Sequence, residues 1–304
     1  NILALHKNAR KVENETPLDE YVWREDPTYA WELIQTTRVF DTTVYIIRLT
    51  SQTWVSEEEV SQPVWWHDLI VAQPDDQYVI SYDVGGMLID GGSNSNEGNY
   101  PDPEDSSVRL TALAAMSLGL VVGDLRQIPN QPIVFYDDPK LKPRSEDSLI
   151  AWTWEYYRQN KTGPDLLARL PMTKAAVRAW DTIADLMASV DDRFDLQRYL
   201  VTGASKRGWT TWTTAAVDER VIGFAPLVLT SLNFVADINH QYQVMGNWSF
   251  ALSSYWEENM TCYLNDPDIQ RIFDIVDPYS YIDRYTVPKL VIAATGDQFF
   301  LPDD

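Results

Sequence analysis

The sequence has little cysteine and few basic residues. Its single cysteine, Cys262, cannot form a disulfide within the chain, so we expect a buried free thiol, or else a bridge to a segment outside this sequence. The 24 basic residues stand against 45 acidic ones, which gives a net charge of -21. Binding to a nucleic-acid backbone requires clustered lysine and arginine, and an anionic membrane surface would repel such a charge. We therefore expect no nucleic-acid partner.

Long hydrophobic runs are also absent. The longest nearly uncharged stretch, residues 110–123, is shorter than the roughly 18 residues that a membrane span needs, so we expect no transmembrane helix. The sequence shown has no basic-then-apolar leader, and a signal peptide would therefore have been removed from it. Zinc-ligand spacings, phosphate-binding glycine loops and dinucleotide fingerprints are missing as well. We expect no metal and no cofactor.

Glycosylation sequons are more frequent than chance predicts. Four occur, beginning at Asn14, Asn160, Asn247 and Asn259. They indicate a secreted, extracellular glycoprotein. The sequence leaves open whether it forms a homo-oligomer.

The chain divides into a short lead-in and one domain. Residues 1–30 are polar and contain two prolines, and we interpret them as an N-terminal arm without packed elements. We expect residues 31–304 to form one domain, in which alternating β-branched and aromatic residues at 31–54 and 64–72 predict antiparallel strands.

Short apolar strands then alternate with amphipathic helices, which is typical of an α/β protein with a mostly parallel sheet and helices on both faces. We expect strands at 86–90, 118–124, 199–202, 221–229 and 289–295, and helices at 108–116, 145–159, 173–190 and up to 217. The long aromatic stretch 230–286 is interpreted as a helical cap insertion.

The most informative motif follows the strand at 199–202. Ser205 stands where an apolar strand turns sharply into a helix, and the small residues Gly203 and Ala204 permit a strained turn that exposes its side chain. The usual pattern is Gly-x-Ser-x-Gly, but here Arg207 occupies the place of the second glycine and Gly208 follows it. The context of strand and helix still predicts a nucleophile elbow, although an ordinary strand–helix connection is the alternative.

A nucleophilic serine needs donors for the developing oxyanion. The backbone N–H of Lys206 and that of Gly92, in the glycine turn after the strand at 86–90, are the candidates. Lys206 and Arg207 lie in the first turn of a helix, where the macrodipole disfavours cations. They meet either a carboxylate of the substrate or acidic residues of the protein, and we take Arg207 as a substrate-binding candidate.

The acid of a catalytic triad should follow the serine in the chain. Asp297 comes directly after the last expected strand and is the candidate, with a plain glycine turn as the alternative. No histidine follows it before Asp304, so we expect the domain to be C-terminally incomplete here. Of the three histidines, His6 lies in the arm, His67 is expected to pack in the core, and His240 precedes the acid.

Tryptophan is abundant, with 12 residues. Trp209 follows the elbow closely and is a candidate for a substrate-binding wall. Packing in the core is the more common role of such residues.

Several long motifs resemble the PhoPQ-activated pathogenicity-related family from about residue 16 onward. They are the segments 16–22, 49–54, 202–210, 215–221, 275–278, 288–290 and 294–300. The resemblance implies an α/β-hydrolase-like fold with Ser205 and Asp297 at the serine and acid positions, and a histidine in a later region. One member of that family, in social amoebae, is regarded as an extracellular signal that restrains proliferation.

Two functions therefore remain open. The chain is either a serine hydrolase acting on a small-molecule or peptide substrate, or a signalling or structural glycoprotein on a weakly active or inactive scaffold, with a cell-surface receptor as partner. Fold alone does not decide between them.

Overall fold

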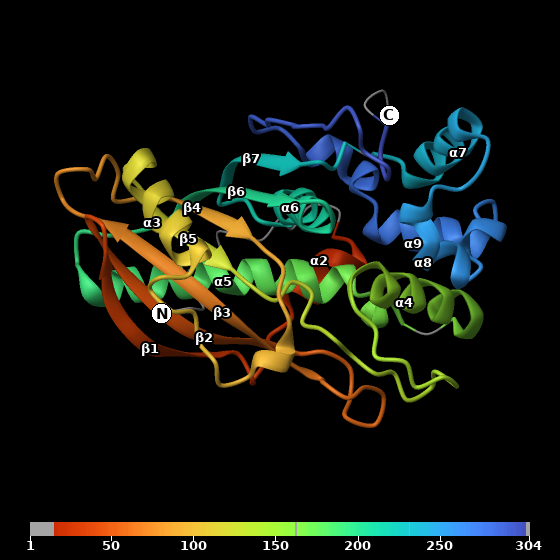
Figure 1. Ribbon diagram of the computed structural model, residues 1–304, viewed down its shortest axis with the longest axis horizontal. Coiled ribbons are helices and arrows are strands. Elements are labelled where there is room, and N and C mark those ends of the chain that lie inside the picture. The colour runs from red at the N-terminus through yellow and green to blue at the C-terminus, as the bar shows by residue number, and fades with distance from the viewer. Residues whose placement is uncertain (1–14, 162, 231, 302–304) are drawn as a thin grey trace.

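A computed structural model describes residues 15–161, 163–230 and 232–301 of the chain. Its centre is a seven-stranded sheet in the order β1-β2-β3-β5-β4-β6-β7 (Figure 1). The strands are β1 (Ala30–Val39), β2 (Thr42–Thr53), β3 (Val64–Pro74), β4 (Val84–Ile89), β5 (Val121–Leu125), β6 (Arg198–Ala204) and β7 (Val221–Leu227).

The sheet is antiparallel from β1 to β5 and parallel from β5 through β4 and β6 to β7. The connections explain the two strand directions. Hairpins join β1, β2 and β3, which makes them antiparallel, whereas helical crossovers connect β4, β5, β6 and β7 and make them parallel. The α/β class expected from the alternating strands and helices is confirmed.

Helices α3 (Ser106–Leu118), α5 (Arg169–Val190) and α6 (Lys206–Val217) pack on the two faces of the sheet, whereas α4 (Glu146–Asn160) packs on the helices of the segment 230–286. The α3 helix contacts β1, β2, β3 and β5, and its Ala112 packs with Ile46 and Ile70. The alternate residues Ile47 and Leu69 belong instead to the main core, which also contains α5 and α6. The period-2 alternation of β2 and β3 thus places one helical layer on each face.

The segment 230–286 is helical, as expected. It contains the α-helices α7 (Phe234–Met245), α8 (Ser253–Glu257) and α9 (Pro267–Val276) and the 3-10 helices η3 (Phe250–Leu252), η4 (Met260–Cys262) and η5 (Pro278–Arg284). Two further 3-10 helices, η1 (Asn94–Asn96) and η2 (Pro164–Leu166), lie earlier in the chain. Helices α8 and α9 pack on α4, at the blue end of the ribbon in Figure 1. Trp154 of α4 is enclosed by Phe234, Tyr255 and Phe273 at ring distances of 5.5, 5.4 and 5.2 Å.

The interpretation of residues 1–30 as an unpacked arm is wrong for the part that the structure describes. Pro17–Trp23 form helix α2, which contacts α5, α6 and α9. Thr16 caps it and Pro17 occupies the first turn, while Leu18 and Val22 are buried. The helix has only 7 residues, too few for a periodic pattern to stand out among polar neighbours. Residues 1–14 lie outside the described part.

The prediction of a continuous strand at 289–295 is also wrong. Within the described residues this segment makes only isolated parallel bridges to β7, at Lys289 and Ile292. It runs along the edge of the sheet and has no described partner on its outer side, so Leu290, Val291 and Ile292 are exposed. Two bridges do not form a continuous hydrogen-bond ladder, so the segment is not a regular strand.

The α5 helix fixes the sheet through tight aromatic packing. Trp180 is fully buried and stacks on Tyr199 of β6 with ring centroids 4.3 Å apart. A Cβ atom on Gly85 would lie 2.6 Å from the Trp180 ring. The glycine therefore lets the indole lie directly on β4.

We predict that Trp180→Ala lowers the free energy of unfolding by about 3–5 kcal/mol, because it leaves a large cavity between α5 and the sheet. Chemical denaturation measures the change. Trp256→Ala is the matched control, since Trp256 is 46% exposed and its loss should cost less than about 1 kcal/mol. Equal losses in the two variants would contradict the packing described here.

Candidate active site

Ser205 lies at the turn between β6 and α6. Its backbone has φ 55° and ψ −126°, a left-handed conformation that is rare for a residue with a side chain. Its N–H donates to the Leu227 carbonyl at 2.9 Å, which ties the turn to the end of β7. The residue is half-buried. A strained serine at a strand-to-helix turn is the geometry of a nucleophile elbow.

Two glycines allow α6 to start this close to β6. A Cβ atom on Gly203 would lie 2.7 Å from the Arg207 carbonyl oxygen, and one on Gly208 would lie 3.1 Å from the Cβ of Leu229. Gly208 is therefore the position at which the backbone of α6 packs closely on the segment after β7. Arg207 occupies the preceding position, and its side chain extends toward the loop after β4. This arrangement explains the departure from the usual glycine spacing.

The glycine turn after β4 lies against the elbow. A Cβ atom on Gly91 would come within 2.7 Å of the Arg207 guanidinium, and Gly92 has φ 152°. The Gly92 carbonyl accepts a hydrogen bond from Gln131 at 3.2 Å. The turn thus lies beside the residues that follow Ser205. Participation of the Gly92 and Lys206 N–H groups in an oxyanion hole stays a prediction.

Acidic residues of the protein compensate the two cations of the elbow. The Lys206 ammonium lies 2.9 Å from Glu146 and 3.1 Å from Asp147, and Arg207 forms two hydrogen bonds with Glu146 at 2.9 and 2.6 Å. Arg207 also donates to the Ile128 carbonyl. The Arg207 group proposed for substrate binding is therefore engaged by the protein itself.

The pKa of Glu146 reflects this network. Burial alone would raise it, but the hydrogen bond from Arg207 and the charges of Arg207 and Lys206 lower the pKa of Glu146 to about 2. The carboxylate stays ionised at neutral pH, and it joins the start of α4 to the start of α6.

A small cavity opens beside Ser205. It is lined by Asp147, Arg169, Ser205, Lys206, Trp209, Leu229, Phe234, Tyr255, Phe299 and Phe300. The Arg169 guanidinium lies 4.1 Å above the Trp209 ring and donates to the Lys206 carbonyl at 3.0 Å. Trp209 is buried, and its indole N–H donates to the Val276 carbonyl at 2.6 Å. The wall thus combines aromatic side chains with the charged groups of Asp147, Arg169 and Lys206.

Asp297 lies in the loop after the edge segment. It is half-buried, and its carboxylate accepts hydrogen bonds from the backbone N–H groups of Phe299 and Phe300 at 2.8 and 3.2 Å. Both phenylalanines line the cavity that contains Ser205. The loop of the expected acid therefore approaches the elbow, and the role of Asp297 stays a prediction.

The histidines are placed as follows. His67 is fully buried, with its ring nitrogens 2.9 Å from the Ser51 hydroxyl and 3.0 Å from the Arg126 carbonyl. Burial lowers its pKa to about 4, so the expected core position is confirmed. His240 lies in α7 and is not among the residues lining the Ser205 cavity. His6 lies outside the described residues.

The remaining candidates are surface features. Asn160, Asn247 and Asn259 are exposed, as glycan attachment requires, and Asn14 lies outside the described part. Cys262 is exposed in the 3-10 helix η4, so the prediction of a buried thiol is wrong.

Over the described ranges, no group of histidine, cysteine or acidic residues is arranged to hold a metal. No helix in those ranges is long and apolar enough to cross a bilayer.

Sequence reasoning did not identify Glu146, Asp147 and Arg169 as parts of this site. The cations at the start of a helix indicated only that a carboxylate, either of the substrate or of the protein, should compensate them. The partners lie about 60 residues earlier in the chain, and nothing local distinguishes them from the other acidic residues. Arg169 carries no motif of its own.

A strained serine above the parallel half of a sheet, with helices on both faces, defines a protein of the α/β-hydrolase fold. Among solved structures, the chain is similar to an acetyl xylan esterase from Paenibacillus sp. R4, with a TM-score of 0.57, 12% identity, and coverage of 100% of this chain and 96% of that one. Acetyl xylan esterase 1 from Thermoanaerobacterium sp. JW/SL YS485 gives a TM-score of 0.56 at 15% identity, covering 99% and 86%. At these identities the likeness supports the fold alone.

The family model for PhoPQ-activated pathogenicity-related protein matches residues 18–304, and the chain belongs to that family. It is also 41% identical over 288 residues to the autocrine proliferation repressor protein A of Dictyostelium discoideum. The match covers 95% of this chain and 56% of that relative, so the chain spans little more than half the relative's length.

We predict that Gly203→Ala destabilises the protein by at least about 1–3 kcal/mol, because the new methyl group would collide with the backbone of Arg207. Thermal unfolding measures this change. The control is Gly163→Ala, where a Cβ atom has no heavy atom within 4 Å. A Gly203→Ala protein as stable as this control would mean that β6 and α6 are not held in close contact.

The Glu146 network predicts a pH dependence. Folding lowers the pKa of Glu146 from 4.5 to about 2, so its contribution to stability is fully present above pH 4.5 and is lost as the pH falls toward 2. Glu146→Gln should cost about 1–2 kcal/mol at pH 7, allowing for partial exposure, and progressively less below pH 4.5. Urea unfolding from pH 7 to pH 3 measures the difference.

Glu104→Gln serves as the control for this titration. The Glu104 side chain is 82% exposed, and its substitution should change stability by less than about 0.5 kcal/mol. If Glu146→Gln lowered the free energy of unfolding equally at every pH, the carboxylate charge would not stabilise Lys206 and Arg207.

Proposed function

We propose that the protein is a secreted serine hydrolase that transfers an acyl group from a peptide, ester or amide through Ser205. The observation that carries the proposal is the left-handed backbone of Ser205 at the end of β6, beside a small cavity lined by aromatic residues. A strained backbone conformation of this kind is retained at functional sites because the surrounding structure holds it there.

In the proposed reaction, the Ser205 hydroxyl oxygen attacks the acyl carbon while a histidine takes its proton. That histidine belongs to the region following Asp304 in the full-length protein, and Asp297 orients it. The backbone N–H groups of Gly92 and Lys206 stabilise the oxyanion. Collapse of the intermediate expels the leaving group with the proton, and water then releases the acyl group from Ser205.

The surroundings of Ser205 support this chemistry. Helix α6 begins at Lys206, so the positive end of its dipole faces the place where negative charge would develop. The glycine turn at 91–92 packs against the neighbouring Arg207. Two solved structures with the same fold are named as esterases that act on acetyl xylan, and an ester is accordingly the first substrate class to test.

The second candidate is an extracellular signal that uses the scaffold without strong catalysis. The 41% identity to a protein named as an autocrine proliferation repressor favours it. The charged groups beside Ser205 also pair among themselves, as Lys206 does with Glu146 and Asp147. A receptor would then recognise the protein's surface.

Labelling of the full-length protein with a serine-directed fluorophosphonate tests the first function. We expect covalent labelling that Ser205→Ala abolishes, because only an activated hydroxyl reacts with this probe. Ser107→Ala, on the distant helix α3, is the control and should label normally.

The outcomes separate the two candidates. Absence of labelling in folded protein would overturn the hydrolase proposal and leave the signalling function. A proliferation assay with Ser205→Ala then adds a second measurement: retained repression by an unlabelled variant would assign signalling to the scaffold, and lost repression would make catalysis part of it.

A further inference from the structure

A buried arginine without an ion pair lines the cavity beside Ser205. Arg169 is 3% exposed, and its guanidinium, which lies over the Trp209 ring, hydrogen-bonds only neutral acceptors, the Lys206 carbonyl at 3.0 Å and the Tyr255 hydroxyl. Among the residues that the structure describes, no carboxylate forms an ion pair with it, and its Nε–H has no hydrogen-bond partner. Burying a charge is costly unless it is paired. The position of this cation in a cavity therefore indicates that a ligand supplies the missing partner.

Other buried arginines of the protein are paired. Arg144 and Arg220 are buried to a similar extent, and each contacts two carboxylates, at 2.9 and 2.6 Å for Arg144 and at 2.7 Å for both partners of Arg220. The 45 acidic residues of the chain would have offered Arg169 a partner as well. Its unpaired state is thus particular to the Ser205 cavity.

The acidic residues closest to Arg169 are already engaged. Asp147 accepts a hydrogen bond from the Tyr255 hydroxyl at 3.0 Å and lies 3.1 Å from the Lys206 ammonium. Asp277 accepts hydrogen bonds from backbone N–H groups at 2.7 to 3.2 Å. Burial lowers the pKa of the Arg169 guanidinium, and the nearby charge of Asp147 does not offset this effect. Arg169 is left able to bind a further anion.

The chemistry and the size of the space indicate a carboxylate. The Nε–H belongs to an edge of the guanidinium at which a carboxylate binds through two parallel hydrogen bonds. The cavity has a volume of about 10 Å³, the room that one water molecule occupies. A planar carboxylate can place one oxygen atom in this space, whereas a tetrahedral phosphate group is bulkier in every direction.

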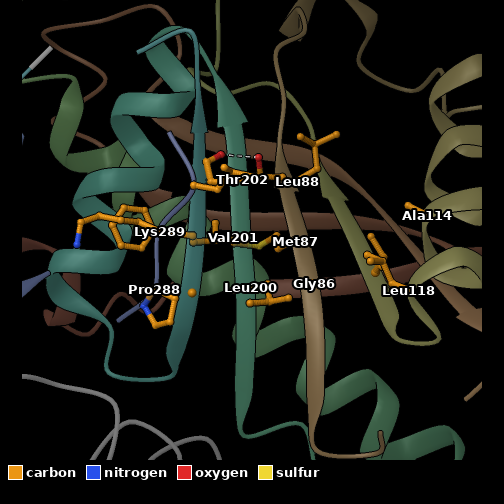
Figure 2. Close-up of a pocket in the computed structure, with 15 residues that line it drawn as sticks. Gly86, Met87, Leu88, Ala114, Leu118, Leu200, Val201, Thr202, Pro288 and Lys289 are labelled. Carbon is orange, nitrogen blue, oxygen red and sulfur yellow. Dashed lines mark hydrogen bonds between the residues drawn. The ribbon is translucent and has the colours of Figure 1, made fainter. Parts of the chain in front are cut away.

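A larger groove of the described chain lacks such a cation. It has a volume of about 560 Å³ and lies over β4, β6 and β7, between α3 and residues 288–290 (Figure 2). Its lining is apolar apart from Thr202 and Lys289, which donate hydrogen bonds to the carbonyls of Ala225 and Tyr285 at 2.6 and 3.1 Å. The unpaired arginine thus distinguishes the Ser205 cavity as a place where an anion binds.

We propose that the Ser205 site is specific for substrates that carry a carboxylate, which Arg169 binds while Ser205 attacks an ester or amide of the same molecule. Trp209 fixes the orientation of the guanidinium, because its ring lies 4.1 Å below it and its own N–H is held by the Val276 carbonyl at 2.6 Å. The inference rests on the hydrolase function proposed for Ser205 and adds the class of substrate to it.

Binding of charged and uncharged ester pairs tests the proposal. Monomethyl succinate, monomethyl glutarate and monomethyl adipate are each compared with the dimethyl ester, so that the members of a pair differ in charge at three distances from the ester. Titration calorimetry on full-length Ser205→Ala protein measures the Kd without turnover. We expect at least one monoester to bind about tenfold more tightly than its diester, because a hydrogen-bonded pair of buried charges is strong.

Arg169→Met in the same background should abolish this preference. Arg193→Met is the matched control, since it removes an arginine that is 47% exposed and does not line the cavity, and it should leave the preference intact. Equal Kd values within all three pairs, no binding of any monoester, or a preference that survives Arg169→Met would each overturn the proposal.

Thermal unfolding separates a binding role of Arg169 from a structural one. Loss of an unpaired buried cation should change the Tm by less than about 2 °C, whereas Arg220→Met leaves two carboxylates without their partner and should lower the Tm by about 4 °C or more. A loss in Arg169→Met as large as that in Arg220→Met would make Arg169 a structural residue and overturn the proposal.

Fluorophosphonate labelling of the protein with Ser205 intact reports separately on the hydrolase function. Labelled protein whose Ser205→Ala form shows no preference for a monoester would contradict the substrate class alone. Unlabelled protein whose Ser205→Ala form shows that preference would contradict the hydrolase function and retain Arg169 as a carboxylate-binding residue.

Discussion

The close contact between the end of β6 and the first turn of α6 is the constraint on which the site depends. It leaves no room for a Cβ atom at Gly203 and forces Ser205 into a left-handed conformation. Leu227 holds the turn through the Ser205 N–H, so β7 also takes part. The strain at one residue is thereby offset by packing and hydrogen bonds contributed from two strands and a helix.

This constraint also determines the electrostatics around the serine. Lys206 and Arg207 begin a helix whose dipole disfavours them, and both are largely buried. Removing such charges from water is costly unless they are paired. Glu146 pairs with both and Asp147 with Lys206, so the start of α4 must lie beside the start of α6. The same pairing orients Arg207 toward Gly91. The same ion pairs therefore neutralise the two cations and hold the Arg207 side chain against the glycine turn.

The sequence predicted those parts of the fold that repeat a local pattern. Alternation in β2 and β3, helical periodicity in α5, and the strand–serine–helix motif at Ser205 all depend on neighbours in the chain. Other features depend on distant partners. Helix α2 is too short to show a period and is stabilised by α5. The edge segment makes only isolated bridges to β7, and the acids that compensate the elbow lie far away in sequence. Such contacts come from tertiary structure, which a single sequence does not encode locally.

The position of α2 has a consequence for biosynthesis. This helix precedes all seven strands of the sheet in the chain, yet it packs on α5, α6 and α9, and Asp19 pairs with Arg284 at 2.9 Å. Contacts of such long sequence separation form late, because the intervening chain must first be ordered. Leu18, Val22 and Trp23 consequently remain accessible while about 260 residues emerge from the ribosome, which makes the nascent chain a natural client for chaperones until α9 and η5 have been synthesised.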